Sequence, residues 1–154
     1  MSLKEQLLQD MKASMKEKDT LRKDVIQIVR AGVLQIEKDN KIELGDEGVI
    51  EVIVREIKKR KDTLPDYKRS GRQDLIDDIE RQINLLTEYL PQQLTEEELM
   101  QVIQAAIEMV SGEAGGAALS IKDMGKVMQI VTPQVAGRAD NKLVSELVKK
   151  KLQV

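Results

Sequence analysis

The chain has 154 residues, with no cysteine, histidine, tryptophan or phenylalanine, and its only aromatic side chains are Tyr67 and Tyr89. The absence of cysteine and histidine excludes disulfides, thiolate zinc sites, iron–sulfur clusters and nucleophilic catalysis of the Ser–His or Cys–His type. The net charge is −2, from 25 Lys and Arg against 27 Asp and Glu, so a signal for nucleic-acid binding would have to be local.

The distribution of apolar residues indicates a protein that does not contact a membrane. No apolar run approaches the roughly 18 residues of a membrane span. The segment from Met1 to Thr20 also lacks the apolar stretch that is typical of a signal peptide. We therefore expect a soluble, cytoplasmic protein. Charged residues make up 34% of the chain, which is above the usual value of about 25% and favours amphipathic helices in water.

Two helices are predicted before residue 40. Ser2 and Glu5 form a capping box at the start of the first, whose apolar stripe recurs every four residues at Leu3, Leu7, Met11 and Met15. The second begins at Asp19 or Thr20, and Gly32 inside it predicts a close helix crossing. Its wider apolar face consists of Leu21, Val25, Ile26, Ile28, Val29, Val33, Leu34 and Ile36.

Two more helices are predicted between the turn at residues 38–45 and Pro91. Asp46 is expected to cap the third helix, which continues into a basic segment, and Pro65 predicts a break or kink near residues 63–65. A turn at Ser70 and Gly71 precedes the fourth helix. Its predicted apolar stripe is Leu75, Ile79, Ile83, Leu86 and Leu90.

The remainder predicts three helices. Thr95 and Glu98 form a second capping box, Ser120 begins a short helix, and Asp140 caps the last. The inward residues of the last helix are predicted to be Leu143, Leu147, Val148 and Leu152. No confident strand pattern occurs, so the fold class is all-α. We predict an N-terminal domain of about four helices over residues 1–92 and a three-helix tail domain over residues 93–154.

Neither the acidic nor the glycine-rich segments predict a metal site, a nucleotide site or a cofactor. Asp74, Asp77, Asp78 and Glu80 stand at a helix start, where carboxylates oppose the helix dipole. The pair Gly125-Lys126 lacks both the earlier glycine and the following Ser or Thr of a phosphate loop. We predict no catalytic residue.

Two basic segments are candidates for RNA binding. The first, residues 55–72, holds eight cations against three acids, and its centre is Lys58, Lys59, Arg60 and Lys61; a solvated helix face is the alternative. The second, residues 115–154, holds seven cations against three acids. Its candidate residues are Lys126, Arg138, Lys142, Lys149, Lys150 and Lys151.

Two glycines accompany the second segment. Gly125 and Gly137 would let another backbone come close, and a helix N-terminus beside Arg138 and Lys142 is suited to a phosphate. The alternatives are helix packing at Gly125, a helix cap at Gly137, and compensation of the helix dipole by the terminal lysines. The residues alone do not decide between them.

Three stretches resemble the GatB/YqeY family, specifically its YqeY-like proteins. They are residues 59–75 (Lys59-Arg60-Lys61-Asp62 to Arg72-Gln73-Asp74-Leu75), residues 89–99 (Tyr89-Leu90-Pro91 to Leu99), and Met124-Gly125-Lys126-Val127-Met128 with Gly137-Arg138-Ala139-Asp140. The resemblance covers essentially the whole chain. It implies an all-helical protein in two parts, similar to the C-terminal region of the B subunit of aspartyl/glutamyl-tRNA amidotransferase.

The resemblance also implies a link to tRNA and to carbon–nitrogen ligation with glutamine as amido-N donor. It supplies no catalytic residue, because the chemical steps belong to parts that this chain lacks. The tRNA role carries over onto Lys126, Arg138 and Lys142, and less directly onto residues 149–151. We therefore expect an accessory module that binds tRNA or structured RNA, with no DNA binding and no catalysis of its own. The alternatives are an adaptor that docks on an amidotransferase or synthetase protein without contacting RNA, and a stand-alone enzyme that uses glutamine.

Overall fold

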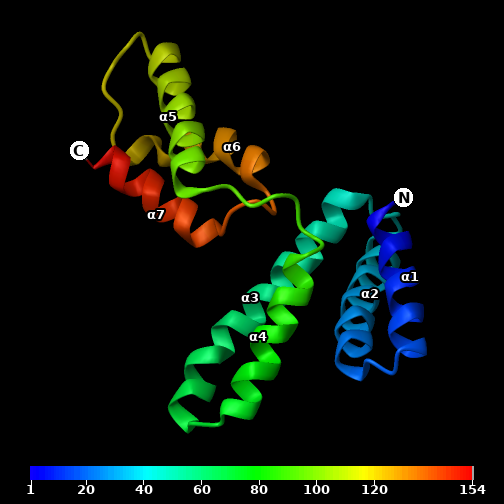
Figure 1. Ribbon diagram of the computed structural model, residues 1–154. Helices are drawn as coiled ribbons and strands as arrows, with labels where there is room; N and C mark the ends of the chain where they lie inside the picture. Colours follow the sequence, from blue (N-terminus) through cyan, green and yellow to red (C-terminus); the bar gives the residue numbers. More distant parts are fainter. Residues whose placement is uncertain (154) are drawn as a thin grey trace. The chain divides into compact units, whose positions relative to one another are not determined.

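The computed structural model describes residues 1–153, and within that range it is built of α-helices without a strand (Figure 1). The all-α prediction is confirmed. The elements are α1 (Leu3–Lys16), α2 (Thr20–Asn40), α3 (Asp46–Ser70), α4 (Gln73–Thr87), α5 (Glu96–Glu113), a short 3-10 helix η1 (Ile121–Asp123), α6 (Met124–Val135) and α7 (Asn141–Leu152).

The helices form two compact units. Met1–Leu90 contains α1 to α4, and the second unit begins at Pro91 and contains α5 to α7. In the first unit α1 packs along α2 and α3 packs along α4, as two helical hairpins joined by contacts between α2 and α3. Each unit has a hydrophobic core of its own.

The core of the first unit is aliphatic. Its buried side chains are Leu7, Val25, Ile26, Val29, Val33, Val49, Val52, Ile53, Ile57 and Leu86. Gly32 faces α3, since a Cβ atom placed on it would lie 3.2 Å from Cγ1 of Val52. The close helix crossing predicted at this glycine is therefore present between α2 and α3.

The predicted apolar stripe of α1 is wrong at its C-terminal end. Met15 is 57% exposed, whereas Ser14 is buried and donates its hydroxyl hydrogen to the carbonyl of Asp10 at 2.7 Å. Steps of four residues advance by about 40° more than a full helical turn, so a strict four-residue repeat drifts off the buried face. Ser14, seven residues after Leu7, returns to that face. In α2 the predicted apolar face is too wide, because Ile28 and Leu34 are exposed whereas Val25, Val29 and Val33 are buried.

The start and the middle of α3 also differ from expectation. Gly45 is the N-cap residue, and the carboxylate of Asp46 instead accepts a hydrogen bond from the backbone N–H of Leu3 at 3.0 Å. Asp46 thus serves the N-terminus of α1, which lies 43 residues away in sequence. The helix continues through Pro65 without the predicted break, and its packing along α4 explains why the lost hydrogen bond is tolerated.

The second unit has a similar aliphatic core, formed by Leu99, Ile103, Ala106, Val110, Val127, Val131, Val135, Val144, Val148 and Leu152. Thr95 and Glu98 make the predicted capping box, and so do Ser2 and Glu5 in α1. In α7 the buried residue is Val144 and not Leu143, which is exposed. A stripe that begins at Leu143 and one that begins at Val144 both fit a helix, and the packing of α7 on α6 buries the one with Val144.

Tyr89 joins the end of α4 to α1. Its hydroxyl donates a hydrogen bond to the carboxylate of Asp10, a residue 79 positions earlier. Partial burial raises the pKa of Tyr89 above its ordinary value of 10.0, and the bond to Asp10 raises it further, so the phenol remains a donor throughout the ordinary pH range. This bond fixes the last turn after α4 on the first hairpin.

Replacing Tyr89 with phenylalanine should therefore lower the free energy of unfolding by about 1–3 kcal/mol, because the partly buried carboxylate of Asp10 loses its donor. Urea denaturation followed by circular dichroism measures this. The matched control is Tyr67→Phe, since the hydroxyl of Tyr67 has no hydrogen-bond partner among residues 1–153 and its removal should change little. Equal effects of the two variants would contradict this role for Tyr89.

Candidate nucleic-acid interface

The exposed cations of the second unit lie on α6 and α7. Lys126 is exposed in the first turn of α6. On α7 the buried residues Val144, Val148 and Leu152 occupy one face, and Lys142 and Lys149 lie together on one flank of the helix, two helical turns apart. Lys150 is also exposed on this helix. These lysines are therefore exposed on two helices that pack against each other.

Charge is segregated between the helices of this unit. Helix α5 carries five acidic residues (Glu96, Glu97, Glu98, Glu108 and Glu113) and no Lys or Arg. The remainder of the unit carries seven cations against three acids. Within residues 1–153, no carboxylate lies within 4.0 Å of the basic groups of Lys126, Arg138, Lys142 or residues 149–151. The positive charge of α6 and α7 is thus not neutralised by ion pairs in the described chain.

Arg138 differs from the lysines because it also supports the local fold. Its Nε–H donates to the carbonyl of Gln92 at 3.2 Å, and its own carbonyl accepts from the N–H of Leu94 at 2.8 Å. The side chain lines a shallow hollow that it shares with Glu98 and Gln134. Arg138 therefore ties the segment before α5 to the turn before α7, so its guanidinium group is partly used by the fold.

The N-terminus of α7 already has an anionic cap. The carboxylate of Asp140 accepts a hydrogen bond from the backbone N–H of Lys142 at 2.9 Å. This bond uses one of the amides that a phosphate would need. At this end of the helix, an anion could therefore bind the ammonium group of Lys142.

The two glycines named in the sequence occupy different conformations. Gly137 has φ of 73°, in the left-handed region that glycine adopts without strain. Gly125 lies in the first turn of α6, and no described atom outside its own helix lies within 4 Å of the position that a Cβ atom would take. Gly137 is therefore needed for the turn itself, whereas the space beside Gly125 is open.

Alanine substitutions should separate these two glycines. Gly125→Ala should raise the free energy of unfolding by about 0.4–1 kcal/mol, because alanine favours the helix and reduces the entropy of the unfolded chain. Gly137→Ala should lower it by about 1–2 kcal/mol, since a Cβ atom disfavours positive φ. Thermal denaturation of the two variants measures both signs, and destabilisation by Gly125→Ala would show an unrecognised close contact.

The first basic segment is partly neutralised within its own helix. Arg60, with a side chain only 12% exposed, bonds the Glu56 carboxylate at 2.8 Å and the Gln82 side-chain oxygen of α4 at 2.8 Å. Lys59 also pairs with Glu56, at 3.2 Å. Lys58 and Lys61 are exposed. Arg60 therefore joins α3 to α4. Its ion pair with Glu56 could have been predicted from the sequence, because an acid four residues before an arginine faces it on a helix.

Loss of the Arg60 side chain should destabilise the first unit. Arg60→Ala should lower the free energy of unfolding by about 1–3 kcal/mol near neutral pH, whereas Lys61→Ala should have little effect. Partial burial raises the pKa of Glu56, but hydrogen bonds from Arg60 and Lys59 outweigh it and hold this pKa below its ordinary value of 4.5. The stabilisation is therefore complete above pH 4.5 and is lost as the pH falls through the lower folded-state pKa.

Urea titrations of the parent protein and the Arg60→Ala variant across this range measure the effect. The difference between them should shrink as the pH falls below 4.5. A difference that is absent at neutral pH, or that grows on acidification, would contradict the assignment.

The acidic residues at the start of α4 have local partners. Asp74 pairs with Arg72 at 3.1 Å, and Asp77 accepts a hydrogen bond from the Gln73 amide at 2.8 Å. Residues 1–153 contain no group of three or more His, Cys, Asp or Glu side chains placed to hold a metal ion. No helix in this range has the length and apolar character needed to cross a membrane.

These features define an all-α protein with two helical units. In the second unit the acidic residues are concentrated on α5, and the lysines lie on the other helices. The chain belongs to the YqeY-like family, since the family described as Yqey-like protein matches residues 4–152. The resemblance drawn from the sequence is therefore confirmed.

Two fungal relatives are similar to this chain, and both are called altered inheritance of mitochondria protein 41, mitochondrial. The protein from Kluyveromyces lactis is 32% identical over 111 residues, which cover 70% of this chain and 60% of the relative. The protein from Pyrenophora tritici-repentis is 25% identical over 146 residues, covering 94% of this chain and 75% of the relative. The chain thus spans less than two thirds of the first relative. Both relatives are named as mitochondrial, and the cytoplasmic location stays a prediction.

Proposed function

We propose that this protein is an accessory RNA-binding module that holds tRNA or another structured RNA through α6 and α7. The observation that supports this proposal is the set of exposed lysines on these two helices, which have no ion-pair partner among residues 1–153. A surface that keeps its positive charge free is suited to the phosphates of a nucleic acid. The acidic helix α5 would limit the contact to one side of the unit.

The side chains available determine how the RNA would be recognised. Both tyrosines belong to the first unit, so the second unit has no aromatic side chain on which a base could stack. Recognition would therefore depend on phosphates and on the shape of a folded RNA, as for double-stranded RNA. The family resemblance favours tRNA, and it links the module to glutamine-dependent amidation without giving this chain a catalytic role.

Titration of tRNA into the full chain, followed by fluorescence anisotropy at low and moderate salt, tests the proposal. Binding should weaken steeply as salt increases, because each phosphate contact releases counterions. The double variant Lys126→Glu with Lys142→Glu should reduce affinity about tenfold or more and should lower the salt dependence by about one unit of slope per cation. Both positions lie in the first turn of a helix, where a glutamate is favourable, so the variant should fold.

The matched control is Lys16→Glu with Lys38→Glu. It changes the net charge by the same amount on the first unit, at the last turns of α1 and α2. The control should retain most of the affinity. An absence of binding at low salt, or equal losses in the two double variants, would overturn the proposal.

An adaptor that docks on an amidotransferase or synthetase protein is the alternative function. A pull-down from lysate before and after nuclease treatment separates the two functions. A partner that is lost with the nuclease supports RNA binding, and a partner that survives it favours the adaptor.

A further inference from the structure

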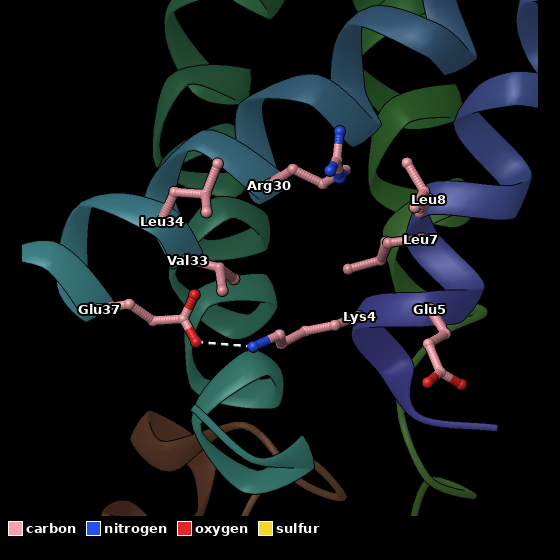
Figure 2. Close-up of a pocket in the computed structure, with 8 residues that line it drawn as sticks. All are labelled: Lys4, Glu5, Leu7, Leu8, Arg30, Val33, Leu34 and Glu37. Carbon is pink, nitrogen blue, oxygen red and sulfur yellow. Dashed lines mark hydrogen bonds and ion pairs between the residues drawn. The ribbon is translucent and has the colours of Figure 1, made fainter. Parts of the chain in front are cut away.

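A small apolar groove lies between α1 and α2, on the first unit. Figure 2 shows Leu8 on α1 and Leu34 on α2 at its two sides, with Leu7 and Val33 deeper between the helices. Leu34 is 59% exposed, although a leucine at that place gains nothing from contact with water. The groove has a volume of about 210 Å³, below the roughly 300–1,000 Å³ of pockets that enclose small molecules. Its size fits the side chains of another polypeptide.

Three of the four charged residues that line the groove are already partnered. The ammonium group of Lys4 lies 2.7 Å from the Glu37 carboxylate, and Glu37 also accepts the N–H of Leu44 at 2.8 Å. These two bonds hold the pKa of Glu37 below its ordinary value. The Glu5 carboxylate accepts the N–H of Ser2 in the capping box of α1. Lys4 and Glu37 therefore offset each other's charge, and the Glu5 carboxylate does not point toward α2 (Figure 2).

Arg30 is the fourth charged residue, and within residues 1–153 it lacks a carboxylate partner. Its guanidinium group projects from α2 toward Leu8 (Figure 2). Its hydrogen bond within residues 1–153 goes to the sulfur of Met11 at 3.4 Å, and a thioether is a weak acceptor. No carboxylate of the described chain lies within 4.0 Å of it. The groove therefore presents one unsatisfied positive charge beside an apolar surface.

We infer that this groove binds an acidic amphipathic helix of a partner protein. Apolar side chains of that helix would lie between Leu8 and Leu34, and a carboxylate one helical turn away would pair with Arg30. Helices that dock in grooves use apolar anchors at spacings of three or four residues, and Arg is well suited to bind a carboxylate with two parallel hydrogen bonds. A second copy of the chain is the less suitable occupant, because a contact between two different surfaces does not close a dimer. The inference is independent of RNA binding, which involves the second unit.

A display library of short alanine-based helices tests the inference. The residues along one face are randomised, and the library is selected on the full chain and counter-selected on a Leu34→Ser variant. Sequences that depend on Leu34 should be enriched in large aliphatic residues at helical spacing together with Asp or Glu. Enrichment of basic sequences, or of sequences indifferent to Leu34, would overturn the inference.

A charge exchange then tests the role of Arg30. One enriched acidic peptide and its Lys-substituted counterpart are titrated against the parent protein and against Arg30→Glu. The parent should prefer the acidic peptide by about tenfold, and Arg30→Glu should prefer the basic one. The matched control is Leu143→Ser, which removes an exposed leucine of α7 and should leave both affinities unchanged.

Sedimentation of the peptide-free protein checks the remaining occupant. The mass should be independent of concentration. Self-association that disappears in Leu34→Ser would show that a second copy fills the groove and would overturn the inference.

Discussion

Every helix of this protein has to bury a narrow aliphatic stripe, and the rest of the structure depends on how that is achieved. The buried side chains are almost all Val, Ile and Leu, and no Phe or Trp is available to fill a wider space. Such helices must approach closely, as Gly32 allows beside Val52 of α3. The structure has two such aliphatic cores, one in each unit.

Because the aliphatic contacts are short in range, polar side chains fix how the helices of the first unit meet. Tyr89 joins the chain after α4 to Asp10 of α1, Arg60 of α3 reaches Gln82 of α4, and Asp46 receives the first N–H of α1. Each bond connects residues that are distant in sequence. These contacts make the pairing of the hairpins specific, since aliphatic stripes alone would pack acceptably in several registers.

The two arginines Arg60 and Arg30 show how the surroundings decide what a charged residue is available for. Arg60 stands in a run of basic residues that resembles a nucleic-acid signal, yet its guanidinium is held by Glu56 and Gln82. Arg30 does not belong to a run of basic residues, yet it lines an apolar groove, and its hydrogen bond within residues 1–153 goes to a thioether. A cation that is already paired supports the fold, whereas an unpaired cation is available to a partner. The number of basic residues along a segment does not show which of the two applies.

The sequence by itself determined the helical class, the family, the capping boxes at Ser2 and Thr95, and the close crossing at Gly32. These features depend on residues within a few positions of one another, or on the conformational freedom of a single glycine. Only the tertiary structure decided that Ser14 and Val144 are buried while Met15 and Leu143 are not, that Asp46 serves α1, and that α3 continues through Pro65. It also decided which cations keep their charge free, because that depends on carboxylates supplied by neighbouring turns and helices. Local patterns fix what a segment can form, and packing between segments selects which of its faces and charges remain exposed.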